Sequence, residues 1–108
     1  MDEILIILLI LLVFLSGCVA PKIKTDLESF KEYCISTCVN EKNRGVSLSN
    51  GPCLLNPMPE NIDWVCDVAH DPRENVDNLP ENQCSAFKEG RATHFIEVTP
   101  DCKFIKAW

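Results

Sequence analysis

Six cysteines between positions 34 and 102 constrain the fold of this 108-residue chain more than any other feature. They are Cys34, Cys38, Cys53, Cys66, Cys84 and Cys102. A domain this small buries a smaller share of its surface than an average domain does, so it usually needs cross-links. An even number of cysteines in a small exported chain is typical of a disulfide framework. The sequence therefore predicts one domain with its six cysteines joined in pairs.

The seventh cysteine, Cys18, closes an apolar run at the N-terminus. Residues 4–15 are all apolar, but the run is shorter than the roughly 20 residues that span a bilayer. It ends in Leu15-Ser16-Gly17-Cys18, which resembles the lipobox of prokaryotic lipoprotein signal peptides. The resemblance covers residues 1–18 only. It implies that residues 1–17 are a signal peptide and that Cys18 receives the lipid.

A lipid on Cys18 would place the protein at the extracytoplasmic face of the cell membrane. Stable anchoring needs two signals, such as two palmitate-type acyl chains, because a single chain binds only reversibly. Residues 18–24 then form the lipidated N-terminus and a short tether. Stretched fully, the part from residue 19 to residue 24 reaches only about 20 Å. We expect the membrane, contacted through this lipid, to be the principal partner.

The charges that flank the apolar run favour a different topology. The segment Met1-Asp2-Glu3 contains no basic residue, whereas Lys22 and Lys24 follow the run. By the positive-inside rule these lysines would keep the downstream domain in the cytoplasm, behind a signal-anchor helix of residues 4–20. In that reducing compartment, Cys34, Cys38, Cys66 and His70 form a possible zinc-ligand set.

Acidic residues are concentrated between positions 63 and 81. The net charge is −6, and it becomes −4 once Asp2 and Glu3 leave with the signal peptide. No basic patch is present, so nucleic acid is not an expected partner. Oxygen ligands suit calcium, and Asp67, Asp71 and Asp77 together with His70 are the candidate metal ligands, although a solvated acidic loop explains the same residues.

Local patterns predict the secondary structure of residues 25–108. Thr25 and Glu28 form a capping-box pattern that begins a helix reaching about Arg44, with cysteines 34 and 38 on one face. Further predicted elements are a strand over 64–69, a short helix from about 80 to 90, and a hairpin of 92–98 with 103–107 in which Val98 lies opposite Lys103. The predicted fold is a small disulfide-rich α+β domain, with one long N-terminal helix on a short antiparallel sheet of about three strands.

The helix prediction limits how the cysteines can pair. Cys34 and Cys38 lie one turn apart, with Cβ atoms roughly 5–6 Å apart, whereas a disulfide needs about 3.5–4.5 Å. Both must therefore reach other elements. Cys66 on the predicted strand and Cys102 at the hairpin turn are the expected targets, which leaves Cys53 to pair with Cys84.

No sequence motif marks a catalytic centre. His70 and His94 are the only histidines, and neither lies beside a known nucleophile signature. We expect His70 to bond Asp71, and His94, Trp64 and Trp108 to pack in or against the core.

The sequence therefore favours a lipoprotein that displays a small disulfide-stabilised binding or structural module at the cell envelope. It indicates no cofactor and does not specify a protein or ligand partner. The alternatives are a membrane-tethered domain that binds zinc or calcium, and an envelope enzyme that uses His70 with nearby carboxylates.

Overall fold

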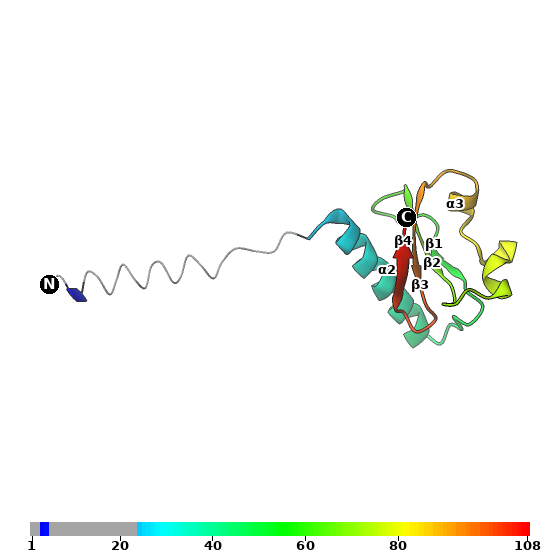
Figure 1. Cartoon of the computed structure of the whole chain (residues 1–108), viewed down its shortest axis with the longest axis horizontal. Coiled ribbons are helices and arrows are strands. Elements are labelled where there is room, and N and C mark those ends of the chain that lie inside the picture. The colour runs from blue at the N-terminus through cyan, green and yellow to red at the C-terminus, as the bar shows by residue number, and fades with distance from the viewer. Residues whose placement is uncertain (1–2, 5–23) are drawn as a thin grey trace.

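The computed structural model of the chain describes residues 3–4 and 24–108 (Figure 1). Most of the predicted signal peptide, the lipidation site Cys18 and most of the tether lie outside these residues. Within the described part of the chain, no helix combines the length and the apolar character that crossing a bilayer requires.

The helix predicted after Thr25 is present as α2, Asp26–Asn43, and is 18 residues long. Its N-cap is Thr25, whose hydroxyl accepts a hydrogen bond from the Glu28 backbone N–H at 3.3 Å. Cys34 and Cys38 are the helix residues that are fully buried, whereas Leu27 is 43% exposed. The face that α2 turns to the sheet is therefore centred on two sulfurs rather than on a broad stripe of large apolar side chains.

The sheet has four strands, in the order β1 (Cys53–Leu55), β2 (Trp64–Val68), β3 (His94–Val98) and β4 (Phe104–Ala107). The β1–β2 and β3–β4 pairs are antiparallel, but β2 and β3 are parallel. The predicted arrangement of a long helix on a short sheet is thus present, but the sheet has four strands rather than about three and one of its pairs is parallel. Parallel neighbours need a long crossover connection, and the segment between β2 and β3 provides one.

That crossover holds three short helices: η1 (Asn75–Asn78), η2 (Pro80–Asn82) and α3 (Ser85–Lys88). The single short helix predicted from about residue 80 to residue 90 is therefore broken in two, with Gln83 and Cys84 extended between its parts. In Figure 1 these short helices lie on the opposite side of the sheet from α2.

The C-terminal hairpin exists but its predicted register is wrong. Val98 lies opposite Phe104 rather than Lys103, and Ile96 lies opposite Ala107. The register shifts between Glu97 and Val98, next to a turn closed by a hydrogen bond from Thr99 N–H to Lys103 O. An irregularity of this kind offsets one strand against the other, and residue alternation in sequence gives no sign of it.

The two faces of the sheet bury different sets of residues. The α2 face carries the larger core: Cys34, Cys38, Leu48, Met58, Cys66, Val68, Ile96, Val98 and Cys102. The other face packs Val65 against Cys84, Ala86 and Ala92.

Three disulfides link these layers. They confirm that Cys34 and Cys38 pair with Cys66 and Cys102, and that Cys53 pairs with Cys84. Which helical cysteine meets which target is a finding of the structure, because the prediction left it open. Cys34–Cys66 and Cys38–Cys102 join α2 to the sheet, with Cα separations of 5.5 and 5.6 Å. Cys53–Cys84, with a Cα separation of 5.1 Å, joins β1 to the start of α3 on the other face.

Candidate functional site

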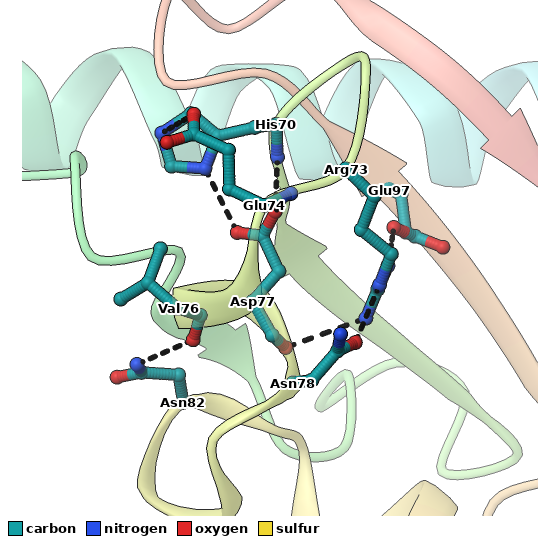
Figure 2. Close-up of polar contacts among 8 residues, drawn as sticks. All are labelled: His70, Arg73, Glu74, Val76, Asp77, Asn78, Asn82 and Glu97. Carbon is teal, nitrogen blue, oxygen red and sulfur yellow. Dashed lines mark hydrogen bonds and ion pairs between the residues drawn. The ribbon is translucent and has the colours of Figure 1, made fainter.

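His70, one of the predicted site residues, is held between two carboxylates (Figure 2). Its Nδ1 atom lies 2.9 Å from Asp77 Oδ1, and its Nε2 atom lies 3.3 Å from Glu74 Oε2. The predicted bond to Asp71 is wrong, because η1 folds the chain back and brings Asp77 to the ring instead. Because each ring nitrogen contacts a carboxylate, His70 links the end of β2 to Glu74 and to η1.

Asp77 organises this loop from a buried position. Its Oδ2 atom accepts hydrogen bonds from the backbone N–H groups of His70 and Glu74, both at 2.9 Å. Burial alone would raise the pKa of Asp77, but these backbone bonds and the His70 ring outweigh it and hold that pKa below its ordinary value. The carboxylate also lies against Gly51, where any Cβ atom would overlap it.

The structure rules out the zinc-ligand set and does not bring the candidate calcium carboxylates together. Three of the four proposed zinc ligands, Cys34, Cys38 and Cys66, are oxidised in disulfides. Two of the candidate calcium ligands lie in different places. Asp77 accepts hydrogen bonds within the loop between β2 and η1, whereas Asp67 lines a cavity beside α3. Across residues 3–4 and 24–108, no group of three or more His, Cys, Asp or Glu side chains is placed to hold a metal ion.

The second histidine and the two tryptophans lie at one end of the sheet. His94 is half-buried, as predicted, and stacks on Trp64 with ring centroids 4.6 Å apart. Trp64 also packs on Phe30 of α2. Trp108 was expected in the core but is 70% exposed, with its ring close to Phe95.

A cavity of about 340 Å³ lies between the sheet and α3, on the face turned away from α2. Val65, Cys84, Phe87 and Phe95 supply its apolar lining. Its polar lining residues are Asp67, Arg73, Gln83, Lys88 and Glu97. An apolar pocket of this size with a few convergent polar groups is the usual form of a small-molecule site.

The pairing of β2 with β3 brings two carboxyl groups together in this cavity. Asp67 and Glu97 are directly opposite in the parallel register, on strands that lie roughly 4.8 Å apart. Glu97 is neutralised by Arg73, whose Nη1 atom donates to Oε2 at 3.0 Å (Figure 2), and by Lys106, whose Nζ atom is 3.7 Å from Oε1. Its side chain is only 8% exposed.

Asp67 has no such partner. Its Oδ1 atom is buried and makes no hydrogen bond to any described residue. Burial, reinforced by the charge of Glu97, raises the pKa of Asp67 to about 8, although Arg73 opposes the change. The carboxyl group of Asp67 is therefore protonated at neutral pH, beside the Glu97 side chain that Arg73 and Lys106 contact.

The sequence suggests Asp67 only as a candidate calcium ligand, and Arg73, Glu97 and the cavity are not among the predicted site features. One signal was available: Asp67 interrupts the apolar run 64–69, so a carboxyl group lies in a strand that is otherwise buried. The proximity of Asp67 to Glu97 could not be predicted from the sequence, because the two residues are 30 positions apart and meet only through the β2–β3 pairing.

No protein-family model, no curated protein and no solved structure matches this chain. Its class is therefore defined by what the chain itself displays: a small domain with one long helix, a four-stranded mixed sheet and three disulfides.

Proposed function

We propose that this protein is a lipid-anchored envelope lipoprotein that displays a disulfide-stabilised binding module outside the cell membrane. The observation that carries the proposal is the pairing of cysteines. The three disulfides use all six cysteines that follow the lipobox, so none of the six remains to pair with Cys18. Disulfides persist in oxidising compartments outside the cytoplasm, and an acyl chain gives Cys18 a separate role.

The start of the fold is consistent with a lipid anchor. Thr25, the N-cap of α2, lies seven residues after Cys18 in the sequence. A connection of that length would hold the domain within about 20–25 Å of the bilayer surface. The binding role in this proposal is supported by the cavity beside α3, where Asp67 retains an unsatisfied carboxyl oxygen.

Intact mass spectrometry of the protein purified from membranes tests the anchor. The expected mass is that of residues 18–108 plus acyl chains, less six hydrogens for the disulfides. Cys18→Ala should leave an unprocessed, unlipidated precursor. Ser16→Ala is the matched control, because it keeps a small residue before the cleavage point and should still be processed.

Two results would contradict the proposal. Full-length, unlipidated wild-type protein in membranes would favour the signal-anchor topology. Free thiols at the six domain cysteines of freshly isolated protein would place the domain in a reducing compartment.

A further inference from the structure

Two of the four charged residues that line the cavity beside α3, Glu97 and Arg73, are paired with each other, and Lys88 and Asp67 have no ion-pair partner among the described residues. Glu97 contacts Arg73 at 3.0 Å and Lys106 at 3.7 Å. Arg73 also donates to the Asp77 backbone oxygen at 3.3 Å, so its guanidinium already has hydrogen-bond partners within the protein. Asp67 is different, because its Oδ1 atom has no partner in the described part of the chain. A ligand that donates to Asp67 would satisfy the group that the fold leaves unsatisfied.

The apolar lining limits what else such a ligand carries. Phe87 and Phe95 meet edge to face with ring centroids 5.1 Å apart, and Val65 lies on the same face of the sheet. A volume of about 340 Å³ is at the small end of the roughly 300–1,000 Å³ found for small-molecule sites. The cavity therefore fits a compact apolar group attached to a single polar head.

We propose that this cavity binds a small organic amine, with its ammonium group on Asp67 and its apolar part against Phe87 and Phe95. An ammonium supplies both the N–H donors and the positive charge that Asp67 lacks, and cations are attracted to phenyl faces. An anionic ligand would instead place a third acidic group beside Asp67 and Glu97. The inference rests on the binding role proposed above, but it does not depend on the lipid at Cys18.

Binding of this kind must be linked to the release of a proton. Near neutral pH the Asp67 carboxyl holds a proton, since its pKa is raised to about 8 by burial and by Glu97. A protonated amine pairs with the ionised carboxylate, and the displaced proton passes to solvent. The charged groups that face Asp67 are Glu97 of β3, Arg73 of the loop and Asp77 of η1, and Lys88 of α3 lines the same cavity.

The ammonium could belong to a free amine or to a lysine side chain of a peptide. Benzylamine represents the first source, and an acetylated, amidated pentapeptide with one central lysine represents the second. Benzoate and benzyl alcohol match benzylamine in size but carry a negative charge or none. The protein is the full chain in detergent, followed by amide NMR titration and by calorimetry in buffers of different ionisation enthalpy.

The proposal expects benzylamine to bind with a dissociation constant of roughly a millimolar, a usual value for so few atoms. Affinity should rise by up to about tenfold per pH unit between pH 6 and 8, and up to one proton should be released per ligand. Asp67→Asn should weaken binding by about tenfold or more, whereas Asp71→Asn, an exposed carboxyl in the next loop, should not. Cys18→Ala should bind as the wild type does, which separates this test from the anchor test.

Three results would contradict the proposal that this cavity binds an amine. They are benzoate or benzyl alcohol binding as tightly as benzylamine, equal benzylamine affinity in Asp67→Asn, and no shifts of residues lining the cavity at millimolar ligand. The proton release is measured on the wild-type protein, so its absence alone would contradict Asp67 as the anchor, whatever the stability of the variant. If the peptide binds and benzylamine does not, the site recognises a protein chain and the small-amine assignment is wrong.

Discussion

At the scale of single residues, Asp67 lowers the stability of the fold. A free aspartate ionises near pH 4, whereas burial and Glu97 raise the pKa of Asp67 in the folded protein to about 8. Between these two values the folded state binds one more proton than the unfolded state. The free energy of unfolding therefore falls as pH rises through this window, by up to about 1.4 kcal/mol per pH unit. A group that costs stability inside a cavity is a strong candidate for function.

Replacing Asp67 with asparagine should remove this pH dependence. The asparagine side chain has a similar size and stays neutral at every pH. We expect Asp67→Asn to be more stable than the wild type at pH 8 by several kcal/mol, roughly 3–5, with the difference disappearing towards pH 4. Urea unfolding at pH 4, 6 and 8 measures this difference. The exposed control Asp71→Asn should follow the wild type throughout, and parallel pH profiles for all three proteins would refute the assignment.

Gly51 is a second residue whose environment dictates its identity. Its φ angle is +66°, and an added Cβ atom would overlap Asp77 Oδ1 and crowd the Val68 carbonyl. Gly51→Ala should therefore lower the free energy of unfolding by about 2–4 kcal/mol. Gly45→Ala is the matched control, because Gly45 also has a positive φ, +87°, but nothing lies within 4 Å of its added Cβ atom.

The comparison separates backbone strain from crowding. Gly45→Ala should cost only the backbone part, about 1–2 kcal/mol. The additional loss in Gly51→Ala should be accompanied by changed NMR signals for His70 and Glu74, since their N–H groups bond Asp77. Equal losses in the two variants would show that Asp77 does not need the space that Gly51 leaves.

At the scale of elements, the docking of α2 depends on its disulfides. Two of its residues, Cys34 and Cys38, are fully buried, and both are cross-linked. Replacing the pair Cys34 and Cys66 with alanine should cost roughly 3–4 kcal/mol through the unfolded chain, and more through the loss of packing. Urea unfolding and far-ultraviolet circular dichroism report the stability and the helix content.

The third disulfide provides a matched control for that experiment. Cys53–Cys84 closes a separation of 31 residues and Cys34–Cys66 one of 32, so the loop contribution is the same. Cys34 and Cys66 are completely buried, whereas Cys53 is half-buried. The Cys34/Cys66 variant should therefore be the less stable of the two and the one that loses helix signal. Equal losses in both would mean that α2 docks without its disulfide.

Peptide mapping without reductant checks the connectivity itself. Cleavage after Lys42, Arg73 and Lys88 and before Asp63 separates the six cysteines, apart from Cys34 and Cys38, which fragmentation between them resolves. The expected products are Cys34 linked to Cys66, Cys38 linked to Cys102, and Cys53 linked to Cys84. A Cys34–Cys38 link would be incompatible with the helical geometry of α2.

At the scale of the whole molecule, the fold is contained in the part that follows the proposed tether. Among residues 3–4 and 24–108, the buried core residues run from Cys34 to Cys102, and α2 is capped by Thr25. A chain of residues 19–108 secreted into an oxidising compartment should therefore fold with three disulfides and keep the urea midpoint of the full chain. Loss of dispersed NMR signals, or free thiols after secretion, would show that the N-terminal segment contributes to folding.

The sequence alone determined the local features of this protein: the Thr25 cap, the approximate extent of α2, and the presence of strands that overlap Trp64–Val68 and His94–Val98. These follow from contacts within a few residues. Helix geometry excludes a Cys34–Cys38 bond, but only the tertiary structure decided that Cys34 meets Cys66 and that Cys38 meets Cys102. Only the tertiary structure decided that β2 and β3 run parallel, that the hairpin register shifts, and that Asp77 rather than Asp71 meets His70. It also placed Asp67 beside Glu97, and thereby created the cavity and its protonated carboxyl group. The physical reason is that burial and charge at a side chain are set by neighbours distant in sequence, and the pattern of one strand does not contain the identity of the strand beside it.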